Sequence, residues 1–171
     1  VTDRCNLRCR YCMPDEQVPV LQDRELLSFE EIERVCRILP KVGIRRIKLT
    51  GGEPLVRKDI AELITRLKKV EGIEQVTLTT NGTLLADRIK ELETAGIDGI
   101  NVSLDTLDPE RFGHLTQRRR LEDVLRGIEA LQTSDIPRIK LNCVPMEEIN
   151  GDELARLAAL AKDSRLAVRF I

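Results

Sequence analysis

Gln75-Val76-Thr77-Leu78-Thr79-Thr80 decides the fold, because apolar and polar residues alternate along it. Alternation has the two-residue period of a β-strand, so Val76 and Leu78 lie on one face and Thr77 and Thr79 on the other. The same pattern recurs in three more segments, which predict strands over residues 45–50, 99–104 and 138–143. A last strand is predicted from residue 166.

Helices are predicted between these strands, where apolar residues recur every three or four positions. The first begins with the capping box Ser28-Phe29-Glu30-Glu31 and others follow Asp59 and span residues 84–95. Four apolar stripes are expected to be buried: Ile32, Val35, Cys36 and Leu39; Ile60, Leu63, Ile64 and Leu67; Leu121, Val124, Leu125 and Ile128; Leu154, Leu157 and Ala161. Strict alternation of strand and helix predicts parallel strands with right-handed crossovers.

The polar face of each strand narrows the fold further. Parallel strands that are covered by helices on both sides are usually apolar on both faces, and these are not. A polar face beneath a second helical layer would cost roughly 1–3 kcal/mol for each unpaired group. A curled sheet avoids this cost because its polar face lines a cavity. We therefore predict an α/β fold, a partial barrel of parallel strands with ligands at their C-terminal ends, rather than an antiparallel sheet with one wet face.

The composition and the ends of the chain limit the classes of protein to which this sequence can belong. The 171 residues carry a formal net charge of −1, with one tyrosine, three phenylalanines and no long apolar run. These features argue against nucleic-acid partners and a membrane span, and we expect a single domain over residues 1–171. The chain begins at Val1 and stops at Ile171 inside a predicted strand, so we expect a fragment incomplete at both ends, with most of its first strand missing. Residues 14–24 are polar and aperiodic and predict a loop.

Three cysteines lie close together near the N-terminus, at Cys5, Cys9 and Cys12. Three thiolates on one short loop can hold three corners of a cubane iron–sulfur cluster, which leaves the fourth iron open for a cofactor or substrate. A disulfide is disfavoured by the short spacing and the odd number of cysteines. Structural zinc stays open as an alternative, although it normally requires a fourth ligand.

The remaining candidates have simpler interpretations. Cys36 and Cys143 fall on apolar faces and are expected to be core residues. His114, the only histidine, lies between Phe112 and Leu115 and is expected to be structural rather than a general base. The run Arg118-Arg119-Arg120 precedes a predicted helix and is expected to be a solvated surface rather than a phosphate site.

Gly51-Gly52-Glu53-Pro54 follows the strand predicted over residues 45–50, about forty residues after the cysteine loop. Together with Tyr11 and the spacing of the cysteines, this motif resembles the radical S-adenosylmethionine superfamily. Other segments are similar to the branch of that superfamily that cyclises GTP in molybdenum cofactor biosynthesis. They are TDRCNLRCRYCMP, LTGGEPLVRKD, LTTNG, VSLDTLDPERF, KLNCVPM and VRFI, and they cover nearly the whole chain.

The resemblance implies a fold and a set of site residues. The fold is a partial (β/α)6 barrel of the TIM type, and the metal site is a 4Fe–4S cluster on Cys5, Cys9 and Cys12. Contacts to S-adenosylmethionine are implied at Tyr11, Gly51, Gly52, Glu53 and Ser103. Contacts to GTP are implied at Lys48, Thr79 and Lys140.

Two of the implied GTP contacts are lysines on the polar face. Lysine is a compact point charge for phosphate, which suits a triphosphate. Lys48 stands where the family usually has arginine, and the lost bidentate fork puts GTP affinity in question. The alternative for an inward lysine is an internal ion pair with Asp105.

The resemblance also implies a reaction and partners. A lyase would convert GTP to (8S)-3',8-cyclo-7,8-dihydroguanosine 5'-triphosphate by means of a 5'-deoxyadenosyl radical that takes the 3' hydrogen. Implied partners are a flavodoxin- or ferredoxin-type electron donor and a downstream cyclic pyranopterin monophosphate synthase, in the cytoplasm, and a homodimer is compatible. A second 4Fe–4S cluster is expected only in the full-length protein, so these residues should hold about four irons and not turn over GTP alone. Open alternatives are another radical enzyme such as a peptide-modifying maturase, and a non-catalytic zinc or iron–sulfur module.

Overall fold

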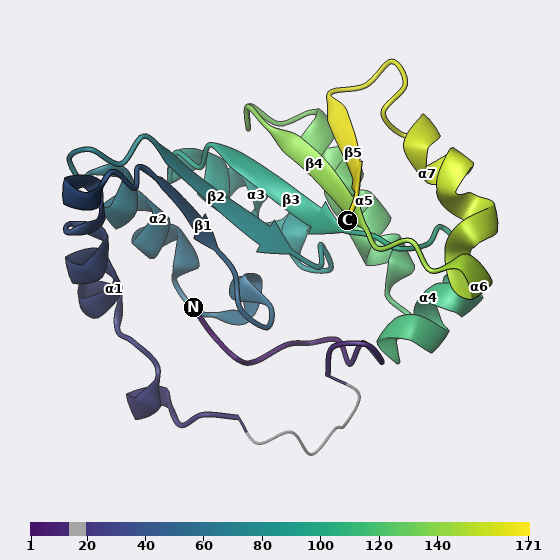
Figure 1. Ribbon diagram of the computed structural model, residues 1–171, viewed down its shortest axis with the longest axis horizontal. Coiled ribbons are helices and arrows are strands. Elements are labelled where there is room, and N and C mark those ends of the chain that lie inside the picture. The colour runs from purple at the N-terminus through teal and green to yellow at the C-terminus, as the bar shows by residue number, and fades with distance from the viewer. Residues whose placement is uncertain (14–19) are drawn as a thin grey trace.

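The computed structural model describes residues 1–13 and 20–171 and is built around one parallel sheet (Figure 1). The strands lie side by side in sequence order: β1 (Arg46–Leu49), β2 (Gln75–Thr80), β3 (Gly99–Ser103), β4 (Ile139–Cys143) and β5 (Leu166–Phe170). Because every right-handed crossover then turns the same way, the connecting helices collect on one face. The sequential order confirms a barrel-like curled sheet in place of a doubly wound one.

Helices surround the sheet unequally. The α-helices are α1 (Phe29–Cys36), α2 (Ile60–Lys68), α3 (Leu85–Thr94), α4 (Pro109–Thr116), α5 (Leu121–Gln132), α6 (Glu147–Asn150) and α7 (Leu154–Ala159). Short 3-10 turns are η1 (Asp23–Glu25), η2 (Leu39–Val42), η3 (Pro54–Val56) and η4 (Gly151–Glu153). Figure 1 shows α2, α3 and α5 behind the sheet. No helix of the described residues is both long and apolar enough to cross a membrane.

The core lies between the sheet and these helices. Leu78, Ile100 and Leu141 point from their strands into it and are at most 1% exposed. The predicted stripe of α2, from Ile60 to Leu67, is fully buried against them. Full burial of each such side chain stabilises the fold by about 2 kcal/mol, so this face carries most of the hydrophobic stabilisation.

The other face of the sheet is polar and faces the viewer in Figure 1. Strand register arranges its side chains in rows across the strands. One row consists of Thr79, Asn101 and Lys140, and the next of Ser103, Asn142 and Arg169. Arg169 joins this face because its neighbour Val168 packs against the core, as the two-residue period of β5 requires.

Two apolar stripes differ from prediction. Val35 is 50% exposed and Leu125 is 38% exposed, although both were expected to be buried. The α-helical turn of α1 ends at Cys36 and tightens into η2, which leaves Val35 outside the contact with the core. In α5 the buried stripe runs through Val124, Gly127, Ile128 and Leu131, and Leu125 lies beside it.

Helix α4 was not predicted, and α7 ends earlier than its stripe suggested, because Ala161 lies beyond Ala159. The start of α4 nevertheless has a clear sequence signal. Asp108 accepts a hydrogen bond from Arg111 N at 2.8 Å, and Pro109 occupies the first turn. Of the predicted loop over residues 14–24, positions 14–19 lie outside the described residues.

Candidate functional site

The segment that carries the cysteines is seated on the end of β1. Gly52 N donates to Thr2 O at 2.7 Å, and Glu53 N donates to Arg4 O at 2.7 Å. A Cβ atom on Gly51 or Gly52 would overlap the backbone of Thr2 or Arg4. Only glycine allows so close an approach, so this pair fixes the position of the cysteine loop.

Gly51 and Gly52 were expected to contact S-adenosylmethionine. In the structure, the backbone of these glycines packs against the N-terminal segment instead. The space that a side chain would fill is taken by the N-terminal segment itself. A contact of Gly51 or Gly52 with S-adenosylmethionine therefore stays a prediction, and it would have to use their other side.

Glu53 ties the end of β1 to the end of β2. Its carboxylate is fully buried and accepts hydrogen bonds from Leu55 N (2.9 Å), Thr80 Oγ1 (2.7 Å) and Asn81 N (2.6 Å). Burial raises the pKa of this carboxyl above its usual range, and the three donors act in the opposite direction. Because protein groups occupy its oxygens, a direct contact of the Glu53 side chain with a cofactor also stays a prediction.

Two asparagines position the first cysteine. Asn6 Nδ2 donates to Thr83 Oγ1 at 2.8 Å, and Asn81 Nδ2 donates to Asn6 Oδ1 at 2.8 Å. Asn81 Nδ2 also lies 3.8 Å from Cys5 Sγ, and Leu7 N donates to the same sulfur at 3.4 Å. Hydrogen bonds to sulfur favour a thiolate ligand and orient it.

Neither Asn6 nor Asn81 stands out in the sequence by itself. The available signal is the position of Asn81, a polar residue directly after β2, where the carboxyl ends of parallel strands collect ligand-binding groups. Its pairing with Asn6 across 75 positions is a feature of the fold alone.

The middle of the cysteine loop is held by the end of α4. Arg8 N donates to Thr116 O and Arg10 N to Leu115 O, both at 2.9 Å, and Arg10 Nε donates to His114 O at 2.8 Å. Carbonyl groups in the last turn of a helix have no partner within the helix. The loop therefore supplies the missing donors, and its conformation is coupled to the unpredicted helix.

Tyr11 closes the loop against the ends of β3 and β4. Its hydroxyl donates to Asp105 Oδ2 at 2.5 Å, while Asp105 Oδ1 accepts from Val144 N at 2.9 Å. Burial, followed by Asp105 itself, raises the pKa of Tyr11, which keeps the phenol protonated as a donor. Among the ion pairs within the described residues, none includes Lys48 or Lys140, so the alternative pairing with Asp105 is not formed there.

The three thiols fit an iron–sulfur cluster in their chemistry and grouping. All are free, and burial together with the nearby charges of Cys5 and Cys12 raises the pKa of Cys9 to about 11. Cys12 N and Met13 N both donate to Cys9 O, so a tight turn holds Cys9 and Cys12 together. Nowhere in residues 1–13 and 20–171 do three ligating side chains converge on one metal ion, as structural zinc would require. A cubane differs, because each thiolate binds its own iron.

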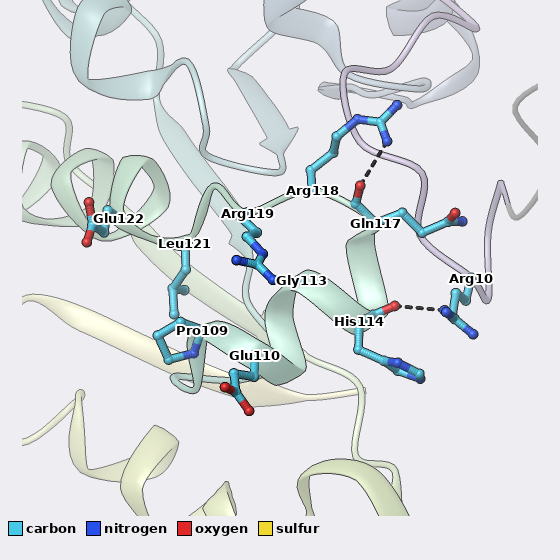
Figure 2. Close-up of a pocket in the computed structure, with 10 residues that line it drawn as sticks. All are labelled: Arg10, Pro109, Glu110, Gly113, His114, Gln117, Arg118, Arg119, Leu121 and Glu122. Atoms are coloured by element: carbon cyan, nitrogen blue, oxygen red, sulfur yellow. Dashed lines mark hydrogen bonds between the residues drawn. The ribbon is translucent and has the colours of Figure 1, made fainter.

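Two cavities border the loop. A small one of about 30 Å³ brings together Cys9, Tyr11 and Ser103, so three predicted site residues meet at the end of β3. A larger one of about 760 Å³ lies on the α4 side, between Arg10 and the start of α5 (Figure 2). None of the predicted cluster, cofactor or GTP contacts lines the larger cavity.

The predicted GTP contacts share the polar face but not one row. Thr79 and Lys140 are half-buried and lie in the same row across the strands. Lys48 is exposed and lies beside Thr77 in the strand register, in the row two residues earlier. The structure adds Arg169, a third cation on this face. It also adds Asn142, whose Oδ1 is buried and has no hydrogen-bond partner among the described residues.

His114 and the arginine run are also placed. His114 is exposed and contributes its carbonyl to Arg10, rather than a side chain to the core. Arg119 is exposed, and Arg120 pairs with Asp123 at 2.6 Å. Cys36 and Cys143 are buried, 5% and 1% exposed, as predicted.

Comparison with known proteins adds independent findings. The GTP 3',8-cyclase of Heliobacterium modesticaldum is 52% identical over 171 residues, which is all of this chain and 52% of that protein. Molybdenum cofactor biosynthesis protein 1 of Bos taurus is 43% identical over the whole chain, which covers 27% of it. The chain thus spans about half the length of the bacterial relative.

Solved structures show the same fold at low identity. The FeFe-hydrogenase maturase HydG superposes with a TM-score of 0.77 at 16% identity, over 99% of this chain and 41% of that one. The family model described as the radical SAM superfamily matches residues 1–161. With its parallel curled sheet and its three-cysteine loop at the strand ends, the chain belongs to the radical SAM superfamily.

Proposed function

We propose that this chain forms the cluster-binding part of a GTP 3',8-cyclase, a lyase of molybdenum cofactor biosynthesis. The observation that carries the proposal is the polar sheet face, where Lys48, Lys140 and Arg169 lie on neighbouring strands of a sheet whose β1 and β3 ends contact the segment of the three cysteines. Whole-chain identities of 52% to a GTP 3',8-cyclase and 43% to a molybdenum cofactor biosynthesis protein 1 support the same substrate. The product would be (8S)-3',8-cyclo-7,8-dihydroguanosine 5'-triphosphate.

Cys5, Cys9 and Cys12 would hold a 4Fe–4S cluster, and Tyr11, Gly51, Gly52, Glu53 and Ser103 would hold S-adenosylmethionine. When bound, these two groups would supply the radical chemistry needed to remove the 3' hydrogen of GTP. The chain keeps the loop in place through Asn6, Asn81 and the end of α4. Because Asn6 is bound by residues that follow β2 and the backbone of Arg8 and Arg10 by the end of α4, the loop is held rigidly from two separate parts of the fold.

GTP would lie across the polar face. Lys48, Lys140 and Arg169 offer positive charge for the triphosphate, and Thr79 offers a hydroxyl. The unpaired Oδ1 of Asn142 is a buried acceptor that a hydrogen-bond donor on the substrate would satisfy. Burying a polar acceptor without a partner is costly, so this atom supports a ligand on this face.

The whole protein would need more than these residues. We place a second 4Fe–4S cluster outside this chain, together with a flavodoxin- or ferredoxin-type electron donor and a cyclic pyranopterin monophosphate synthase that takes the product. A cytoplasmic location suits five free thiols, and a homodimer is compatible. Residues 1–171 would act as a single domain.

Anaerobic turnover of the full-length protein tests the proposal. The cluster is reconstituted, reduced with dithionite and mixed with S-adenosylmethionine and GTP. We expect 5'-deoxyadenosine and the cyclised nucleotide in equal amounts, and iron analysis of residues 1–171 alone should give about four irons per chain. Release of 5'-deoxyadenosine with a peptide but not with GTP would point to a peptide-modifying maturase. No 5'-deoxyadenosine under any condition would leave a non-catalytic metal-binding module.

A further inference from the structure

The side chain of Asn150 closes the segment that follows β4, and the proposed function gives it no role. It is fully buried, with 0% of its surface exposed. Its Nδ2 donates to Asp105 O at 2.7 Å and to Val144 O at 3.0 Å, while its Oδ1 accepts from Met146 N at 2.7 Å. Because both ends of the amide are bonded, its orientation is fixed, and it ties the segment after β4 to the end of β3.

Asp105 connects this amide to the cysteine loop. Its Oδ1 accepts from Val144 N at 2.9 Å, within the segment that Asn150 closes. Its Oδ2 accepts from the hydroxyl of Tyr11 at 2.5 Å. Asn150 holds the backbone of Asp105 and Val144 holds one of its oxygens, so the second oxygen is directed at the loop.

The bond to Asp105 sets the position of the Tyr11 side chain. Tyr11 is 53% exposed, so packing against the core does not hold its ring. A hydroxyl that donates to a carboxylate forms a stronger hydrogen bond than one between two neutral groups. Among the ion pairs of the described residues, none includes Asp105, and no lysine or arginine competes there for the oxygen that Tyr11 uses.

Tyr11 also holds the arm of the loop that carries Cys12. It lies between Cys9 and Cys12 in sequence, and Cys12 N and Met13 N donate to Cys9 O within the loop itself. In the part of the chain that the structure describes, the bond from Tyr11 is the only hydrogen bond that joins residues 11–13 to the strand ends. Loss of this bond would therefore free the arm that carries the third thiol.

We propose that Asp105 and Asn150 are positioning residues of the cofactor site. Through Tyr11 they hold the arm of Cys12 in the place that binding of S-adenosylmethionine requires. The inference rests on the proposed function, because Tyr11 is a cofactor contact only if this chain binds S-adenosylmethionine. The path of contacts leads from the segment after β4, through the end of β3, to the loop.

The first test measures binding of S-adenosylmethionine to the full-length protein, with its cluster reconstituted under anaerobic conditions. Tyr11→Phe removes the hydroxyl and Asp105→Ala removes its acceptor, and each should raise the Kd for S-adenosylmethionine roughly tenfold. The double variant should bind no more weakly than Asp105→Ala alone, because both changes break the same bond. Asp105→Asn should bind within about twofold of wild type, since its amide can accept from Val144 N and donate to the hydroxyl of Tyr11.

Asn150 is tested through its dependence on Tyr11. Asn150→Ala should raise the Kd roughly tenfold in the wild-type background and less than about twofold in Tyr11→Phe, where the bond that it supports no longer exists. Ser134→Ala is the matched control, because Ser134 is also a buried side chain that closes a turn next to β4, before the strand instead of after it. Its hydroxyl donates to Leu131 O at 2.7 Å, away from the loop, so the Kd should stay unchanged.

A second readout needs no cluster. Hydrogen–deuterium exchange of the cluster-free full-length protein, followed by mass spectrometry, reports local opening of the peptide over residues 5–13. Its exchange should be about threefold or more faster in Asn150→Ala, Asp105→Ala and Tyr11→Phe, and unchanged in Ser134→Ala. Asp105 is half-buried and Tyr11 is exposed, so these two variants keep the test decisive if Asn150→Ala does not fold.

Unchanged affinity and unchanged exchange in Tyr11→Phe would overturn the inference while leaving the proposed function intact. The inference would also be overturned if Asn150→Ala weakened binding equally with and without the Tyr11 hydroxyl, or if Ser134→Ala weakened it as much. A wild-type protein that binds no S-adenosylmethionine would overturn the proposed function and this inference with it.

Discussion

Val76 and Leu78 are fully buried on one face of β2, while Thr77 and Thr79 remain half-exposed on the other face of the same strand. The packed face contacts α2, α3 and α5, and it contributes stability without reaching any predicted ligand. The open face carries the charges and hydroxyl groups, and its stability cost is low because water or a ligand satisfies them. The comparison predicts that substitutions on the two faces have separable effects on stability and on binding.

Loss of a cluster ligand should give the largest effect of all. Cys9→Ala removes one of three thiolates, so iron bound per chain should fall by about four while the thermal midpoint of the protein without cluster stays unchanged. Cys143→Ala is the matched control on the packed face. It should keep all of the iron and lower the free energy of unfolding by about 1 kcal/mol. Iron loss in the control, or retention in Cys9→Ala, would contradict the assignment of the loop.

Adjacent positions on β2 provide the sharpest comparison of stability. Leu78→Ala should lower the free energy of unfolding by about 2–5 kcal/mol, because the side chain leaves a cavity in a fully buried site. Thr79→Ala should change it by less than about 0.5 kcal/mol, since the residue is half-buried on the open face. Urea unfolding of both variants measures the difference, and similar values for the two would show that both faces are packed.

Lys140→Ala should affect binding and leave stability alone. If Lys140 binds the triphosphate as proposed, its removal should weaken GTP binding by about tenfold or more in the full-length protein. The free energy of unfolding should change by less than about 0.5 kcal/mol, because Lys140 makes no ion pair among the described residues. Isothermal titration with GTP measures the first effect. Unchanged affinity would remove Lys140 from the substrate site.

The buried carboxyl of Glu53, which ties the end of β1 to the end of β2, predicts that the free energy of unfolding depends on pH. Its folded-state pKa is raised by burial, so the folded protein binds a proton that the unfolded chain releases at the same pH. Its contribution to stability is therefore complete below the unfolded-state pKa and declines as pH rises through the folded-state pKa. Relative to Glu53→Gln, wild type should lose stability with rising pH in mildly acidic solution. Parallel stability curves for the two proteins would contradict this.

Lys48→Arg should have the smallest effect. Arginine would add the bidentate fork that the family resemblance implies at this position, and we expect GTP to bind about two- to fivefold more tightly. The exposed position of Lys48 leaves room for the larger side chain. Titration with GTP, with Lys41→Arg as a control far from the sheet face, measures the gain. Weaker binding would show that position 48 has been adapted to lysine.

Most of the architecture could be predicted because it depends on local periodicity. The boundaries of β2 agree with the predicted residues 75–80, and the capping box at Ser28 forms as expected. Helix α4 was missed although Asp108 and Pro109 mark its start, because its apolar residues are few and its length is only two turns. The burial of Val35 was wrong because the pattern continues past the point where α1 tightens into η2.

The surroundings of the cysteine loop could not be predicted in the same way. The partners of Asn6, Arg8 and Tyr11 lie 75 to 108 positions away in the chain, just after β2, at the end of α4 and just after β3. No periodic pattern connects residues at such separations, since their meeting depends on strand register and on the path of each connecting segment. The cavity next to Arg10 exists for the same reason.

By itself, the sequence determined which residues face the helices, which face the open side of the sheet, and that three thiols share one short loop. Local sterics and the periods of strand and helix are sufficient for those features. Only the tertiary structure decided that the bare backbone of Gly51 and Gly52 meets the cysteine segment, that α4 receives its N–H groups, and that Arg169 joins the polar face. Those features are contacts between distant parts of the chain, and packing of the complete fold is what brings their partners within hydrogen-bonding distance.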